Sequence, residues 1–168
     1  ELLGKEETGI ATEHEQALLR LLTPLAKLYT AKQAITVTSE ALEAFGGAGY
    51  IEDTGLPQLL RNAQVLSIWE GTTNILSLDV LRAIEKENAA VAFIHEVHQR
   101  LNSINAPQLL LSKNKTQKAM QKIQNYLHSM PNLSPEEQQI GARCFAFTLT
   151  QTYIASLLLE YSEWALHT

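Results

Sequence analysis

The sequence has little of several features that would place it in a particular class of protein. Only one of its 168 residues is a cysteine, Cys144, so an internal disulfide is excluded. No apolar run reaches the roughly 18–20 residues that a membrane-spanning helix needs, and we expect no membrane partner. Lysine and arginine number 13 against 18 acidic residues, which gives a formal net charge of −5. That balance argues against a dedicated nucleic-acid binder.

Strand signals are also missing, because no segment alternates convincingly between apolar and polar residues. Helix signals take their place, and the sequence predicts an all-α fold. Thr12 with Glu15 forms one capping box. Thr23-Pro24 is typical of a helix start, and the apolar spacing after it predicts a helix that ends at Gly46-Gly47.

A polar cluster at residues 85–88 indicates an internal boundary. We therefore expect two parts, a helical bundle over residues 1–86 and a helical appendage over residues 87–168, packed on the bundle or on a neighbouring subunit. A second capping box, Ser134 with Glu137, predicts a last helix through Leu158 or further. Its predicted docking face contains Ile140, Cys144, Phe147, Ile154, Leu157 and Leu158, extended by Tyr161 and Trp164. Cys144 is expected to be buried there.

Two glycine-broken segments carry the candidate chemistry. The first, Glu43 to Tyr50, is a helix end with bare backbone, which suits either an ordinary glycine cap or the close approach of a phosphate or cofactor. In the second, Ser67 to Ile75, Glu70 follows an apolar run and an indole. A carboxylate among apolar groups makes a general base, whereas one at a solvent-facing helix end is ordinary, and periodicity alone leaves both open.

The two segments together are more specific. In order and spacing, "FGGAGY", "LPQLLRN" and "SIWEGTTNILSLDVLRAI" resemble the C-terminal part of the acyl-CoA dehydrogenase family, and the resemblance covers Leu22 to Ile84 closely. Three features resemble the alkylation-response (AidB-like) branch of the family: the segment "RLLTPLAK", the tryptophan before Glu70 and the segment "LDVLR". The fold implied is the four-helix-bundle C-terminal domain of that family with an additional C-terminal helical appendage.

The resemblance also implies a cofactor, FAD, and roles for particular residues. Glu70 matches the glutamate that takes the α-proton of an acyl-CoA thioester. In the assembled enzyme we expect it in a groove lined by Trp69 and Gly71 rather than in open solvent. The other matches are Gly71 beside the substrate thioester, Thr72, Thr73 and Asn74 as FAD contacts at a helix start, and Glu43, Gly46 and Gly47 near the FAD of a neighbouring subunit. Many members carry glutamine at position 43, and a carboxylate there suits a pyrophosphate only if it faces away.

Partners follow from the same resemblance: an acyl-CoA substrate, electron-transfer flavoprotein as electron acceptor, and a homo-oligomer, either a dimer or a tetramer. The expected location is the cytoplasm in a bacterium and mitochondria or peroxisomes in a eukaryote. Because the family has an N-terminal helical domain and a central β-domain, we expect this chain to begin within a longer protein. The alternative is a dehydrogenase-like flavoprotein with a protein- or DNA-interaction role and little turnover.

A metal site is not predicted. His95 and His98 are three residues apart, whereas zinc-binding helices place two histidines four apart, and the sequence offers no evident third ligand. A polar helix face accounts for both.

Overall fold

The computed structural model describes residues 1–168 and contains helices but no strand, which confirms the all-α prediction. None of the helices combines the length and hydrophobicity that a membrane span requires. The α-helices are α1 (Leu2–Glu7), α2 (Glu13–Ala44), α3 (Gly47–Tyr50), α4 (Leu56–Leu66), α5 (Thr73–Glu87), α6 (Ala89–Asn102), α7 (Leu110–Ser129) and α8 (Pro135–His167). Three 3-10 turns, η1 (Glu52–Thr54), η2 (Pro107–Leu109) and η3 (Met130–Asn132), lie between them.

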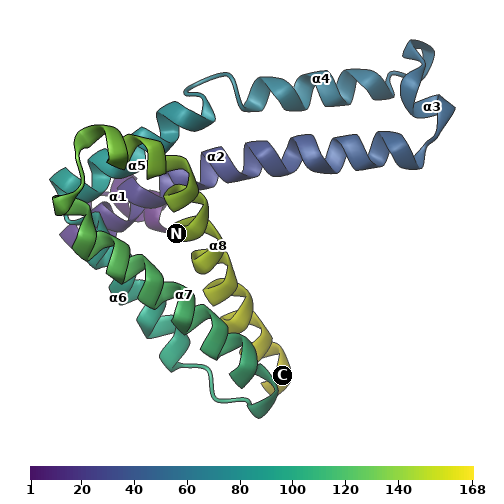
Figure 1. Ribbon diagram of the computed structural model, residues 1–168. Helices are drawn as coiled ribbons and strands as arrows, with labels where there is room; N and C mark the ends of the chain where they lie inside the picture. Colours follow the sequence, from purple (N-terminus) through teal and green to yellow (C-terminus); the bar gives the residue numbers. More distant parts are fainter.

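The helices form two limbs that diverge from a common junction (Figure 1). One limb is an arm made of the second half of α2 and the antiparallel α4, with α3 at its tip. The other limb contains α6, α7 and α8, and the first half of α2 lies at the junction with α1 and α5. The arm leaves large apolar side chains exposed, among them Val37, Phe45 and Leu59 at 65%, 60% and 51%. Two helices alone do not bury such a surface.

Helix α2 begins as predicted but runs through the predicted helix start. The capping box is present, because the Thr12 hydroxyl accepts from the Glu15 N–H and the Glu15 carboxylate accepts from the Thr12 N–H. Pro24, however, lies inside the helix. Proline in a helix interior removes one backbone hydrogen bond, at a cost of about 3 kcal/mol. The leucines before and after Pro24 share one buried face, and their packing keeps the helix continuous.

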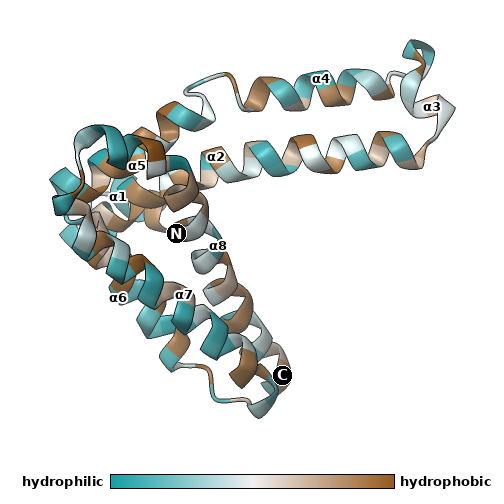
Figure 2. Cartoon of the chain, viewed as in Figure 1, coloured by the Kyte–Doolittle hydropathy of each residue, from teal (hydrophilic) through white to brown (hydrophobic).

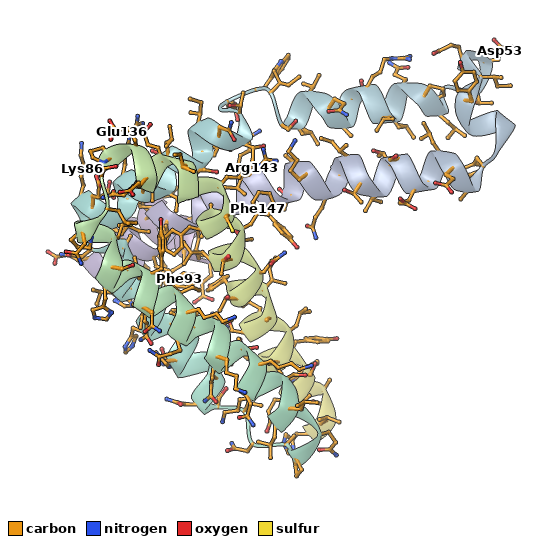
Figure 3. The ribbon with its side chains drawn as sticks, in the orientation of Figure 1. Asp53, Lys86, Phe93, Glu136, Arg143 and Phe147 are labelled. Carbon is orange, nitrogen blue, oxygen red and sulfur yellow. The ribbon has the colours of Figure 1, made fainter.

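The hydrophobic core lies at the junction and along the second limb. Its centre includes Leu21, Leu25, Phe93, Val97 and Leu149, each no more than 1% exposed. Figure 3 shows Phe93 inside the bundle, between the helices of the second limb and α2. These residues come from both sides of residue 88, so the two predicted parts share one core. Helix α5 ends at Glu87, and Asn88 has the left-handed conformation that turns the chain into α6.

The predicted docking face of α8 is wrong in detail. Ile140 is 84% exposed, Leu158 is 61% exposed, and Cys144 is exposed rather than buried. The face that packs on α2, α5, α6 and α7 is built mainly from smaller side chains: Ala142, Phe145, Ala146, Leu149, Thr150, Thr152, Ser156 and Leu159. Small residues let α8 approach several helices closely, whereas Ile140, Leu158 and Trp164 remain exposed.

Gly49 holds the tip of the arm against α2. A Cβ atom added at Gly49 would lie 2.0 Å from the backbone oxygen of Leu42, so any side chain must push the tip away. We expect Gly49→Ala to speed amide hydrogen exchange in residues 42–52 by at least about tenfold, while exchange in α6 stays unchanged, because the strain is local. Gly47→Ala is the control, since a Cβ there meets nothing within 4 Å. Equal protection in both variants would contradict this account.

Candidate functional site

Glu70 lies on a sharp turn between α4 and α5. Its backbone φ is 55° and that of Gly71 is 107°, so two successive residues adopt positive φ. For a residue with a side chain this conformation costs roughly 1–2 kcal/mol, and it persists only where the surroundings enforce it. Such strain is concentrated at functional sites. A Cβ on Gly71 would lie 3.2 Å from the Leu76 side chain, so a larger residue would crowd the start of α5.

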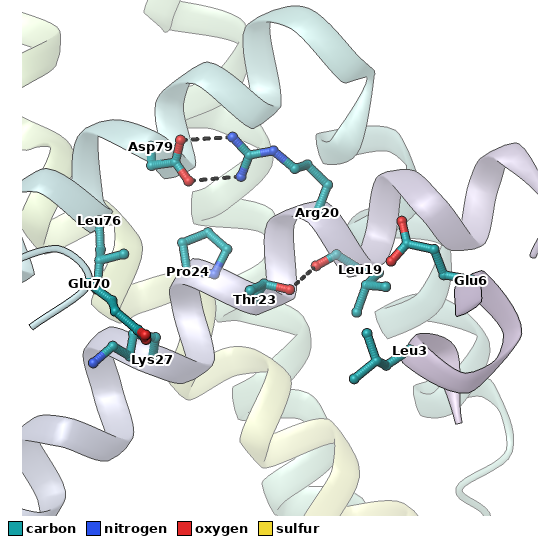
Figure 4. Close-up of a pocket in the computed structure, with 10 residues that line it drawn as sticks. All are labelled: Leu3, Glu6, Leu19, Arg20, Thr23, Pro24, Lys27, Glu70, Leu76 and Asp79. Carbon is teal, nitrogen blue, oxygen red and sulfur yellow. Dashed lines mark hydrogen bonds and ion pairs between the residues drawn. The ribbon is translucent and has the colours of Figure 1, made fainter. Parts of the chain in front are cut away.

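A groove of about 450 Å³ runs beside this turn, between α1, α2 and α5. Glu70 reaches from the turn toward α2, on the side of the groove where Lys27 lies (Figure 4). The Lys27 ammonium donates a 2.8 Å hydrogen bond to the carbonyl oxygen of Leu66, the last residue of α4. Lys27 therefore ties α2 to the segment that carries Glu70. The residues lining the groove are Leu3, Glu6, Leu19, Arg20, Thr23, Pro24, Lys27, Glu70, Leu76 and Asp79.

The groove predicted around Glu70 belongs to the assembled enzyme, and within this chain the neighbours of Glu70 are different residues. Trp69 and Gly71 do not line the groove, and Trp69 points to solvent with 69% of its surface exposed. Glu70 is itself exposed, so the apolar surroundings that the sequence suggested are not supplied within this chain. Ile68 and Ile75 are 59% and 54% exposed on either side of the turn. The turn thus presents a carboxylate within a patch of exposed apolar side chains.

Arg20 and Asp79 close the other end of the groove. The guanidinium donates two hydrogen bonds to the carboxylate, at 2.8 and 2.7 Å (Figure 4). Its Nε also lies 3.3 Å from a Glu87 oxygen. These bonds hold the pKa of Asp79 below its ordinary value. Two-point bonding fixes the relative rotation of α2 and α5 as well as their spacing.

The Arg20–Asp79 pair should make stability depend on pH. Because folding lowers the pKa of Asp79 from 3.8, its contribution is fully present above about pH 4 and is lost as the pH falls below that. Asp79→Asn should reduce the free energy of unfolding at pH 7 by up to about 1 kcal/mol, since both side chains are partly exposed. The difference from wild type should shrink below pH 3.8, as measured by urea denaturation. Glu85→Gln, an exposed site on the same helix, is the control, and a pH-independent difference would contradict the assignment.

The start of α5 supplies free backbone donors next to Glu70. Thr72 precedes the helix in an extended conformation, and its side chain makes no capping hydrogen bond. Thr72 and Asn74 are exposed, whereas Thr73 is only 7% exposed, so its side chain faces inward. An uncapped N-terminus of a 15-residue helix suits a phosphate group, which accepts the free N–H groups and is favoured by the helix dipole.

The structure does not bring the first glycine segment to the same place. Glu43, Gly46 and Gly47 lie at the far end of the arm, separated from Glu70 by the length of α4 (Figure 1). Gly46 has φ 56° and ψ −134°, a conformation suited to glycine. A Cβ on Gly46 or Gly47 would meet nothing within 4 Å, so this backbone is open to a ligand. The two glycine-broken segments therefore do not form a single site within this chain.

Sequence reasoning did not single out Arg20, Lys27 or Asp79. Arg20, Thr23 and Lys27 recur at helical spacing, which is a signal that they share one face of α2. Nothing local indicates that Asp79 faces them, because that pairing joins residues 59 positions apart.

The fold and the site together define a helical domain that presents a carboxylate beside a free helix N-terminus, and comparison with known proteins gives its family. Residues 7–85 match the family described as Acyl-CoA dehydrogenase, C-terminal domain. Residues 88–168 match the family described as Acyl-CoA dehydrogenase 11 C-terminal domain-like. The chain therefore belongs to the acyl-CoA dehydrogenase family, as the sequence predicted, and carries its C-terminal helical region.

Two relatives show how far the similarity extends. Acyl-CoA dehydrogenase family member 11 of Caenorhabditis elegans is 45% identical over 168 residues, which cover 96% of this chain and 27% of that protein. The putative acyl-CoA dehydrogenase AidB of Escherichia coli (strain K12) is 42% identical over 86 residues, which cover 51% of this chain and 16% of AidB. The chain thus spans about a quarter or less of these relatives. The predicted AidB-like branch is not specifically supported, because the similarity to family member 11 continues through the second half.

Solved structures agree with this placement. The crystal structure of Caenorhabditis elegans ACDH-11 in complex with C11-CoA superposes with a TM-score of 0.90 at 43% identity, over 96% of this chain and 28% of that one. The structure of Bd2924 in its apo form gives a TM-score of 0.76 at 42% identity, over 98% of this chain and 29% of that one. At these identities the likeness extends beyond the fold to the family.

Proposed function

We propose that the protein containing this chain is an FAD-dependent acyl-CoA dehydrogenase, in which Glu70 removes the α-proton of an acyl-CoA thioester. The observation that carries the proposal is the placement of Glu70. It lies on a strained turn, at the edge of a groove and directly before the uncapped N-terminus of α5. A carboxylate can serve as the general base, and an uncapped helix N-terminus suits a phosphate group of the cofactor.

Each residue near Glu70 has a role in the proposal. The backbone of Gly71 lets the thioester approach, because position 71 carries no side chain. Exposed Thr72 and Asn74 would hold FAD at the start of α5, and buried Thr73 would contribute through its N–H group. Lys27 and the Arg20–Asp79 pair keep the turn and α5 in register with α2.

The reaction removes a proton and a hydride equivalent from adjacent carbons. Glu70 accepts the proton from the α-carbon, and an α,β-unsaturated thioester results. When bound, FAD would supply the acceptor for the hydride equivalent that leaves the β-carbon, and the proposed electron acceptor for the protein is electron-transfer flavoprotein. Position and orientation are the chain's main contribution, since the proton must lie within hydrogen-bond reach of the carboxylate.

The exposed surfaces support a longer protein around this domain. Ile68, Trp69 and Ile75 surround the turn and remain 54–69% exposed, and the arm is exposed along most of its length. We propose that the remaining domains cover the turn, and that Glu43, Gly46 and Gly47 at the tip of the arm approach the FAD of a neighbouring subunit. That arrangement explains why the two glycine segments lie far apart.

The proposed activity is tested with the full-length protein loaded with FAD. Anaerobic addition of medium-chain acyl-CoA should bleach the flavin absorbance within seconds and yield one enoyl-CoA per flavin, because each turnover delivers two electrons. The matching carboxylic acid without coenzyme A is the control and should leave the flavin oxidised. Flavin that stays oxidised across short, medium and long acyl chains would contradict turnover and favour the interaction role.

A further inference from the structure

The C-terminal half of α8 carries an apolar stripe that borders α2 at Ile154 and is exposed from Leu157 to Trp164. The stripe consists of Ile154, Leu157, Leu158, Tyr161 and Trp164, whose spacing places them on one side of the helix. Leu158, Tyr161 and Trp164 are 61%, 63% and 59% exposed, and the two aromatic rings lie 5.5 Å apart. In Figure 2 this half of α8 is mostly brown and white, whereas the neighbouring α7 is mostly teal.

The stripe is also free of charge. Residues 144–159 contain no Asp, Glu, Lys or Arg. The two acidic residues that follow are bound within the chain: Glu160 pairs with Arg100, and Glu163 accepts two hydrogen bonds, at 3.2 and 3.0 Å, from the N–H of Ala106. These bonds turn both carboxylates away from the stripe. A neutral face neither attracts a basic or acidic partner nor repels a copy of itself.

A second groove, which is apolar, lies beside the stripe. It has a volume of about 260 Å³, runs between α2 and α8, and its walls include Leu22, Tyr29 and Tyr153. Ile154 and Leu157 line this groove and also belong to the stripe, so the two surfaces are continuous. A space of this size accepts a large side chain such as an indole.

We propose that the stripe is a two-fold interface in which α8 packs antiparallel on α8 of a second copy of the protein. With the axis between Leu158 and Tyr161, each Tyr161 faces Leu158 of the other copy. Trp164 then lies at the level of Ile154 and Ala155 of the other copy, beside the groove. In a two-fold antiparallel helix pair, the residue numbers of any two facing positions add up to the same value. The position of the axis therefore fixes all the pairings.

The exposed area is sufficient for such a contact. Leu157, Leu158, Tyr161 and Trp164 are 37–63% exposed. A fully buried aromatic side chain removes roughly 150–250 Å² from water, and these four side chains are about half exposed, so covering all of them on two copies removes at most on the order of 1,000 Å². That is the size at which specific interfaces begin. The inference goes beyond the proposed activity, because the stripe lies outside the groove that contains Glu70 and does not require turnover.

The first test is sedimentation velocity of the full-length protein carrying Trp164→Glu. Two charges placed in an apolar two-fold contact should raise the dissociation constant of one assembly step at least about tenfold, and the far-ultraviolet circular dichroism should be unchanged. Ile140→Glu is the matched control, since Ile140 is on the same helix, is 84% exposed and lies outside the stripe. Wild-type mass for Trp164→Glu at all concentrations would overturn the proposal.

Cross-linking gives an answer that does not depend on weakening the assembly. In a Cys144→Ser background, Tyr161→Cys treated with a short bismaleimide should give a peptide linked between two copies of position 161. Ile140→Cys should give no 140–140 peptide. Absence of the 161–161 peptide would overturn the two-fold contact. A second result would also overturn the two-fold contact: Trp164→Glu loses binding to neutral phosphatidylcholine vesicles but keeps the wild-type mass. The stripe would then be a membrane contact.

Discussion

Replacing Glu70 with glutamine should lower the rate of flavin reduction by acyl-CoA by about 100-fold or more in the full-length, FAD-loaded protein. General-base catalysis is worth roughly 10²–10⁴-fold, and glutamine cannot accept the α-proton. Glutamine has nearly the same shape, so the strained turn at positions 70 and 71 should persist. Stopped-flow absorbance gives the rate, and the flavin-to-protein ratio shows that the cofactor is retained.

A second measurement separates the base from a general disturbance of the site. Wild-type protein should exchange the α-proton of a bound acyl-CoA analogue with deuterium from D₂O, and Glu70→Gln should not. Glu85→Gln, an exposed carboxylate on α5 that does not line the groove, should behave as wild type in both assays. Normal exchange in Glu70→Gln would remove Glu70 from the role of base.

Phe93→Ala should produce the largest loss of stability, about 3–5 kcal/mol in the free energy of unfolding. Phe93 is the largest of the fully buried side chains and is 1% exposed. Its ring lies 5.8 Å from that of Tyr153 on α8, and α6 also packs on α2. Alanine would therefore leave a cavity where three helices meet.

The measurement is urea denaturation of the 168-residue chain followed by circular dichroism. Leu111→Ala is the control, because Leu111 is 68% exposed on α7, and it should change the free energy of unfolding by less than about 0.5 kcal/mol. A single shared core also requires one cooperative transition. Two transitions, only one of them moved by Phe93→Ala, would show that the regions before and after residue 88 unfold separately.

Sequence reasoning was most successful where the signal is local. The capping boxes at Thr12 and Ser134 are both present, because each is a set of hydrogen bonds between residues three positions apart. The family was predicted correctly from motifs at fixed spacing. Pro24 was misleading because its local preference for a helix start was overcome by the leucine packing on both sides of it.

The stripe on α8 shows a different kind of failure. Apolar spacing predicted one broad docking face on the last helix, with Ile140, Cys144 and Leu158 among its members. In the fold the smaller residues face inward, since α8 lies close to α2, α5, α6 and α7 at once. How closely helices approach one another is a property of the assembled bundle, and no window of sequence contains it.

By itself, the sequence determined the helical class, the two capped helix starts, the family and the position of Glu70 next to a glycine. These depend on hydrogen bonds, propensities and spacings within a few residues. Only the tertiary structure decided that Arg20 pairs with Asp79, that Lys27 binds the end of α4, and that the two glycine segments lie at opposite ends of an arm. These contacts join residues 39 or 59 positions apart, and such distances close only when helices pack on a common core.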